Sequence, residues 1–154
     1  MKVALETDLP IAPETAWDWV QTSALLREIT FPLVIFRPIG GPWPERWEET
    51  RYRAWMLLFG VLPFGRQSIV ITKGEDADGY WVRDNGSGDL VATWDHRITL
   101  RRTEDGGTRY ADVVEVKAGV LTPVVWAFAA VFYRWRQRRW RRLAVLGFDP
   151  TGEA

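Results

Sequence analysis

Apolar and polar side chains alternate along this chain with a period that changes from region to region. Residues 3–7 alternate at every second position, as a short strand does. Pro13-Glu14 then opens a helical pattern, and proline is well tolerated in the first turn of a helix. Thr22-Ser23 interrupts that pattern and can cap a second short helix, 24–29, whose apolar residues share one side. The beginning of the chain therefore predicts one strand followed by two short helices.

Between residues 31 and 116 the helical period disappears, and β-branched and aromatic residues alternate with polar ones. Gly, Pro, Asn or Asp residues separate the alternating segments, as tight reversals require. One of these separators is 85–88, where Asn85-Gly86 is a common turn sequence. The pattern predicts an antiparallel meander with strands near 32–37, 48–59, 64–73, 79–84, 92–102 and 108–117.

A second helical pattern begins at Thr122 and continues to about Val145, just before Gly147, a residue type that often ends helices. Its arginines lie in the carboxyl half, where positive charge suits the helix dipole. No internal repeat or low-complexity linker interrupts the chain. We therefore expect a single domain, 1–154, of the α+β class, with its helices on one side of an antiparallel sheet.

The composition limits the chemistry. The chain has 154 residues with 20 basic and 20 acidic side chains, so it has no net charge to attract nucleic acid, and we expect no nucleic-acid partner. It has no cysteine and one histidine, which excludes disulfide frameworks, thiol nucleophiles and histidine-rich metal sites. Glycine motifs that bind phosphates or dinucleotides do not occur in the sequence either. We expect neither a metal nor a cofactor.

Two features bear on location. The amino terminus mixes Glu6 and Asp8 among its apolar residues, unlike a signal peptide. The longest uncharged apolar run, 119–133, has 15 residues, fewer than the ~20 that a membrane-spanning helix needs. The sequence therefore predicts a soluble, cytoplasmic protein.

Four short motifs follow one another in a characteristic order. They are Ile29-Thr30-Phe31-Pro32, a Gly-containing turn at 84–88, Trp94-Asp95-His96-Arg97-Ile98-Thr99-Leu100, and Gly107-Thr108 followed by Asp112. Together with the order of elements, they resemble the helix-grip superfamily, which includes START domains, the major birch pollen allergen group and polyketide cyclase-like proteins, collectively called SRPBCC. The resemblance is strongest to a bacterial ligand-binding branch. The sequence departs from that branch at Ile98 and Leu100, which replace a second histidine and an aromatic residue.

The resemblance implies a curved antiparallel sheet wrapped around a long C-terminal helix, with two short helices near the N-terminus and a cavity between the layers. Proteins of this fold bind lipids, sterols, polyketides or plant hormones, so the fold implies a mode of binding and not a substrate. We therefore expect a hydrophobic small-molecule ligand, namely a lipid, polyketide or aromatic compound. The alternative is a polyketide cyclase- or aromatase-like enzyme.

The strand near 92–102 carries the candidate polar chemistry. Trp94, His96 and Ile98 share the face that we expect to point inward, and Asp112 and Val114 share the apolar face of its hairpin partner. His96 and Asp112 should then lie one or two cross-strand pairs apart. An imidazole beside a carboxylate in an apolar cavity suits a general base or a ligand anchor. The alternative is a pair of buried polar groups satisfied by their neighbours.

Aromatic and aliphatic residues add candidate cavity walls. Trp55 and Leu57 alternate along one strand, and Phe128 and Phe132 lie one helical turn apart. Such residues either line a pocket or fill a core. The predicted ligand-binding set is Trp55, Leu57, Trp94, His96, Ile98, Asp112, Val114, Phe128 and Phe132, with His96 and Asp112 as the catalytic pair of the enzyme alternative.

The stretch from Arg134 to Arg142 contains six arginines and no acidic residue, together with Trp135 and Trp140. The simplest interpretation is a solvated helix end, partly paired with acidic residues of the sheet. The alternative is a module that contacts a membrane surface or another partner. A nucleic-acid interface is disfavoured because the basic residues occupy one helix and the rest of the chain is acidic.

Overall fold

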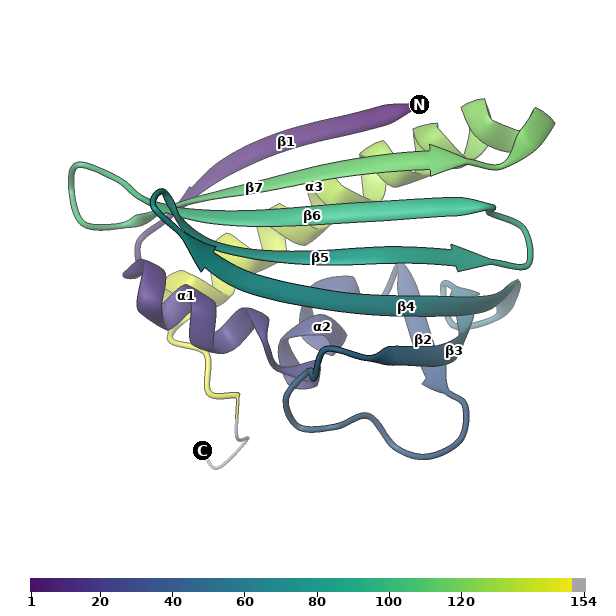
Figure 1. Ribbon diagram of the computed structural model, residues 1–154, viewed down its shortest axis with the longest axis horizontal. Coiled ribbons are helices and arrows are strands. Elements are labelled where there is room, and N and C mark those ends of the chain that lie inside the picture. The colour runs from purple at the N-terminus through teal and green to yellow at the C-terminus, as the bar shows by residue number, and fades with distance from the viewer. Residues whose placement is uncertain (151–154) are drawn as a thin grey trace.

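The computed structural model describes residues 1–150, which form a seven-stranded antiparallel sheet and a helical layer (Figure 1). The strand order is β1-β7-β6-β5-β4-β3-β2, so all strands but β1 lie next to their neighbours in sequence. The strands are β1 (Lys2–Leu9), β2 (Val34–Pro38), β3 (Arg51–Leu58), β4 (Leu62–Asp76), β5 (Gly79–Gly88), β6 (Thr93–Arg102) and β7 (Thr108–Lys117). The predicted meander is confirmed, with strand boundaries shifted by a few residues.

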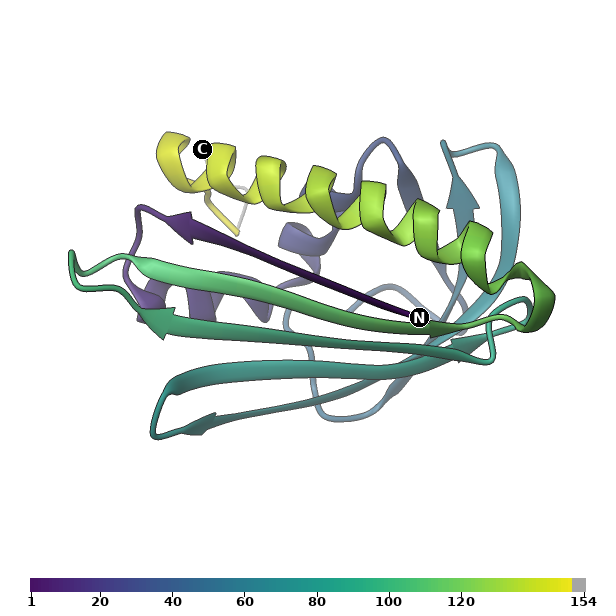
Figure 2. The same cartoon turned by 90° about the horizontal axis from the view of Figure 1, so that it is seen from above.

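The long helix α3 (Thr122–Leu146) crosses one face of the sheet, as Figure 2 shows, and packs on β1, β7 and α2. It follows a short 3-10 turn, η1 (Gly119–Leu121). The β2 and β3 end of the sheet curls toward the side on which α3 lies (Figure 2). With the two short helices α1 (Pro13–Val20) and α2 (Ser23–Thr30), this is the α+β helix-grip architecture expected from the sequence.

The corner between α1 and α2 follows the predicted capping. Pro13 occupies the first position of α1. The Thr22 hydroxyl accepts a hydrogen bond from the Leu25 amide at 3.2 Å and donates one to the Trp19 carbonyl at 2.8 Å. One side chain thus satisfies a free amide at the start of α2 and adds a second hydrogen bond to a carbonyl at the end of α1 that also accepts from the Thr22 amide. This fixes the angle between the two helices.

The turn predicted at 85–88 is wrong, because these residues continue β5. Asn85 pairs with Asp95 and Gly86 pairs with Trp94. The glycines serve close approach between strands and not a reversal of the chain. A Cβ at Gly86 would lie 2.5 Å from the Ser68 carbonyl oxygen, and one at Gly88 would lie 2.4 Å from the side-chain amide of Gln67. Only glycine leaves room for the β4 backbone at position 86, whereas a side chain at position 88 would require the end of the Gln67 side chain to move.

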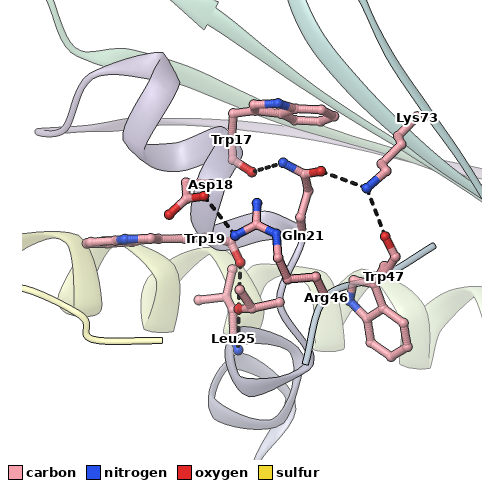
Figure 3. A network of polar contacts seen from close by, with 9 residues as sticks. Trp17, Asp18, Trp19, Gln21, Leu25, Arg46, Trp47 and Lys73 are labelled. Carbon is pink, nitrogen blue, oxygen red and sulfur yellow. Dashed lines mark hydrogen bonds and ion pairs between the residues drawn. The ribbon is translucent and has the colours of Figure 1, made fainter. Parts of the chain in front are cut away.

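A polar network joins the helical corner to the sheet (Figure 3). The Lys73 ammonium donates to the Gln21 side-chain oxygen at 2.7 Å and to the Trp47 carbonyl at 2.8 Å. The Gln21 amide in turn donates to the Trp17 carbonyl at 3.0 Å. Partial burial lowers the pKa of Lys73. The network fixes the loop that carries Trp47 against β4 and the end of α1.

Candidate functional site

A cavity of about 100 Å³ lies between the sheet and the helices. Its walls come from α1, α2, the Trp47 loop, β2 to β6 and α3, so residues from most of the chain converge on it. Most of the lining is aliphatic or aromatic and includes Leu25, Ile29, Met56, Ile71, Val82 and Phe132. A small set of polar side chains interrupts this apolar lining, which is the usual composition of a small-molecule site.

The inward face of β6 is the predicted one. Trp94, His96 and Ile98 are buried and line the cavity. Ile98 pairs with Asp112 across to β7, two register positions from the pairing of His96 with Val114 and on the same face. The His96 Nε2 atom lies 2.7 Å from the Asp112 Oδ1 atom. The prediction that these two side chains share one inner surface is confirmed.

Asp112 is fully buried and accepts three hydrogen bonds. Besides His96, the Tyr110 hydroxyl donates to Oδ1 at 2.8 Å, and the Gln137 amide donates to Oδ2 at 2.9 Å. Burial acts to raise the pKa of Asp112, but the hydrogen bonds and the nearby Arg136 charge hold it below the ordinary value. An ionised Asp112 therefore joins β6, β7 and α3 beside the cavity.

His96 is neutral in this arrangement. Burial lowers its pKa, against the raising effect of Asp112. Because an ionised carboxylate only accepts hydrogen bonds, the Nε2 atom of His96 carries the proton and donates it to Asp112. The Nδ1 atom is then the ring nitrogen that retains a lone pair.

Arg136 was not expected in the site, and its position corrects the interpretation of 134–142 as a solvated helix end. Arg136 lines the cavity and is only 5% exposed, and its guanidinium carbon lies 5.0 Å from the Tyr133 ring centre. Arg134, Arg138, Arg141 and Arg142 are exposed, as predicted. Arg136 follows the buried Phe132 by four positions, so the helical period placed it on the inward face.

The guanidinium of Arg136 is charged and lacks a close counter-ion. Its Nε atom has no hydrogen-bond partner, and no carboxylate of residues 1–150 forms an ion pair with it within 4.0 Å. Burial acts to lower its pKa, but the field of the Tyr110 hydroxyl and of Asp112 holds the pKa above the ordinary value. The cavity wall thus contains a buried positive charge.

Asp84 is a second carboxyl group at the cavity and was also missed. Its Oδ1 atom accepts a hydrogen bond from the Val70 amide at 2.8 Å, where the pairing of β4 with β5 is interrupted between Ser68 and Ile71. Burial raises the pKa of Asp84 to about 7, although the Val70 hydrogen bond and the Arg136 charge act to lower it. Near this interruption, the Gln67 Nε2 atom and the Ser68 Oγ atom have no partner among the described residues.

Five of the predicted ligand-binding residues do not line the cavity. Asp112 lies behind His96, and Val114 is buried in the adjoining core. Phe128 stacks on Phe132 with ring centres 5.8 Å apart. Trp55 is 45% exposed, and Leu57 shares its face of β3.

Both faces of β3 carry apolar residues, so the sequence does not indicate which face of this strand points toward the cavity. Ala54 and Met56 are the buried pair, and Met56 is the residue of this strand that lines the cavity. Trp55 instead lies beneath the Arg66 guanidinium, 6.0 Å from the ring centre, on the outer face. The largest side chain of this strand, Trp55, therefore points away from the site.

The aromatic residues of the arginine-rich stretch are engaged within the fold. Trp140 is fully buried and stacks on Trp19 at 5.9 Å between ring centres. The Trp135 indole donates to the Phe31 carbonyl at 3.0 Å, and the Arg139 guanidinium pairs with Glu28 at 3.5 Å. Within residues 1–150, no helix is long and apolar enough to cross a membrane.

A groove of about 510 Å³ adjoins the cavity on the outside of α2 and β2. Leu26, Thr30 and Phe36 belong to the walls of both spaces. The rest of the groove is mainly apolar, with Val34, Ile35 and Trp43 among its lining residues. The cavity and the groove therefore adjoin each other at these three side chains.

The comparisons with known proteins identify a family and a fold. A family model described as a domain of unknown function, DUF8410, matches residues 7–144. No curated protein matches the chain.

Solved structures share the architecture at low sequence identity. Protein jhp0584 from Helicobacter pylori superimposes with a TM-score of 0.70 at 8% identity, covering 94% of this chain and 88% of that one. A START superfamily protein from Mycobacterium smegmatis gives a TM-score of 0.62 at 14% identity, over 94% and 97% of the two chains. The protein TTHA0849 from Thermus thermophilus gives 0.65 at 12% identity, over 97% and 100%. These similarities show a START-like helix-grip fold.

Proposed function

The chain belongs to the DUF8410 family, a domain of unknown function, and we propose that it binds a hydrophobic small molecule in the cavity between the sheet and α3. The observation that carries the proposal is the internal cavity of about 100 Å³, lined mainly by apolar side chains with a few buried polar groups. Such a lining would match part of a lipid, a polyketide or an aromatic compound, with the rest of the molecule in the adjoining groove of about 510 Å³. The START-like fold supports the same mode of binding.

The test is a cavity-filling substitution. Ile98→Phe adds a ring to the cavity wall, so it should abolish binding of an environment-sensitive fluorophore while the protein stays folded. Val113→Phe is the matched control, because Val113 lies on the next strand, β7, and is 43% exposed. Native mass spectrometry of freshly purified protein should show a bound apolar molecule that Ile98→Phe lacks. Equal fluorophore binding by both variants would exclude the cavity as the binding site.

A second candidate function is supported by the His96–Asp112 pair, whose imidazole lines the cavity. With Nε2 donating to Asp112, Nδ1 is available as a proton acceptor, as a cyclase- or aromatase-like enzyme would require. His96→Gln keeps a polar side chain and removes the titratable base. Loss of turnover of an identified ligand, by about 100-fold or more with binding intact, would establish the enzyme. We expect His96→Gln to leave any turnover unchanged and to alter ligand affinity only modestly, as for a protein that carries its ligand without converting it.

A further inference from the structure

Arg136 is a buried positive charge without a partner of opposite sign. Charged groups removed from water are normally paired, since the loss of hydration is otherwise uncompensated. Asp112, which neutralises the surroundings of Arg136 at longer range, already accepts hydrogen bonds from His96, Tyr110 and Gln137. The Nε atom of Arg136 still has no hydrogen-bond partner among the described residues. The cavity wall therefore offers a charged donor to whatever occupies the cavity.

The other unpartnered polar atoms at the cavity can also donate. Gln67 and Ser68 are lining residues of the cavity, and their buried Nε2 and Oγ atoms have no hydrogen-bond partner within residues 1–150. Gln67 is 7% exposed and Arg136 is 5% exposed, so bulk solvent does not satisfy them. Asp84 at the same wall carries little negative charge below neutral pH, because burial raises its pKa to about 7. Water would satisfy these donors, but it would supply no negative charge to Arg136.

The sizes of the two spaces limit the shape of the ligand. The cavity of about 100 Å³ is smaller than a cavity of about 150 Å³ that accepts benzene. It therefore holds a polar head and little more. The adjoining groove of about 510 Å³ has room for an apolar tail, and the walls of the two spaces share Leu26, Thr30 and Phe36.

We propose that the ligand is a monocarboxylate with an apolar tail, whose carboxylate binds Arg136, Gln67 and Ser68 and whose tail passes Leu26 and Phe36 into the groove. This inference rests on the proposed function and specifies the class of molecule bound. A carboxylate supplies both the negative charge that Arg136 lacks and the acceptor oxygens that the amide and the hydroxyl lack. Arg136 is the anchor that distinguishes an acid from an equally long neutral molecule.

The experiment compares decanoate with decanol, which have the same chain and different heads, by isothermal titration calorimetry below micelle-forming concentrations. The wild-type protein should bind decanoate at least about tenfold more tightly than decanol, as expected for a desolvated charge-assisted pair. Arg136→Met should lose this preference and retain decanol binding. Arg138→Met, an exposed arginine of the same helix, is the matched control and should keep the preference.

The outcomes separate the inference from the proposed function. Equal affinity of the wild type for the two compounds, or an unchanged preference in Arg136→Met, would overturn the carboxylate inference alone. Failure of both compounds to bind the wild type would overturn the inference, and the proposed function too if the fluorophore also fails to bind. Should Arg136→Met not fold, Ser68→Ala provides the second arm. It should weaken decanoate binding several-fold and leave decanol unaffected, and equal weakening of both would contradict the assignment.

Discussion

Burial keeps Asp84 protonated in the folded protein, so the free energy of unfolding should decrease as pH rises toward neutrality. The pKa of Asp84 is about 7 in the folded protein and 3.8 in a solvated chain. Between these two values the folded state holds a proton that the unfolded state has released. Stability therefore falls as pH rises through this window, which is the reverse of the usual behaviour of an acidic residue. The largest possible decrease in the free energy of unfolding is about 4 kcal/mol, because each unit of difference between the two pKa values corresponds to about 1.36 kcal/mol.

The substitution that isolates this effect is Asp84→Asn, because asparagine keeps an oxygen for the Val70 amide and cannot ionise. Between about pH 5 and about pH 8, the wild type should lose about 2.5 kcal/mol of unfolding free energy relative to the variant. The comparison is needed because His96 acts in the opposite direction. Burial lowers the pKa of His96, so its contribution to stability falls as pH decreases below the ordinary histidine range. His96 is present in both proteins, and its contribution cancels in the difference.

The assay is equilibrium urea unfolding at several pH values, followed by tryptophan fluorescence. Asp95→Asn is the matched control on the neighbouring strand. Asp95 pairs with Arg83 at 2.8 Å, and this hydrogen bond holds its pKa below the ordinary value, so it stays ionised throughout the window. The stability difference between the wild type and Asp95→Asn should thus stay nearly constant, because the Asp95 charge makes only the smallest contribution to the raised pKa of Asp84. A difference for Asp84→Asn that is equally constant, to within about 0.5 kcal/mol, would refute the reasoning.

Three further substitutions test the fold around the site. Gly79→Ala should lower the free energy of unfolding in urea by about 2 kcal/mol more than Gly106→Ala does. Both glycines have positive φ, but only a Cβ at position 79 meets backbone, 2.2 Å from the Leu100 carbonyl oxygen. Equal losses would contradict the predicted clash. Asp112→Ala leaves three buried donors unpaired and should lower stability by about 3–5 kcal/mol, measured in the same way, whereas a loss below about 1 kcal/mol would show that the cluster is not desolvated. Thr22→Ala removes a helix cap and should lower the thermal midpoint by an amount equivalent to about 1 kcal/mol, with Thr22→Ser as the variant expected to retain it.

The elements that could be predicted from the sequence are those whose side-chain period has one dominant apolar face. In β6 the even-numbered residues from Trp94 to Leu100 are apolar or aromatic and the odd-numbered ones are polar or charged, so the inward side of His96 followed directly. In β3 apolar residues occupy both faces, and the alternation of Trp55 and Leu57 indicated one face, whereas Met56 on the other face lines the cavity. Periodicity does not decide between two apolar faces, because the curvature of the sheet sets which side is enclosed.

The polar part of the site was less predictable because residue type was weighted above position. Arg136 was grouped with its arginine neighbours, although its spacing from Phe132 and Trp140 puts it on the buried face of α3. Asp84, Gly86 and Gly88 were assigned to a turn because Asn-Gly is a common turn sequence. In the structure these glycines are instead needed, or favoured, because β4 lies close to this strand. The crowding arises from β4, and a contact between strands is not visible in either strand alone.

The position of β1 has a consequence for the order in which the protein folds. In the described part of the chain β1 pairs only with β7, and their paired residues lie roughly 100 positions apart in sequence. During synthesis β2 to β6 can each pair with a neighbour soon after it emerges, but β1 must wait until β7 has been made. The α3 helix packs on β1 and β7, so it docks on a surface that forms last. We therefore expect the pairing of β1 with β7 and the docking of α3 to be late and nearly simultaneous events in folding.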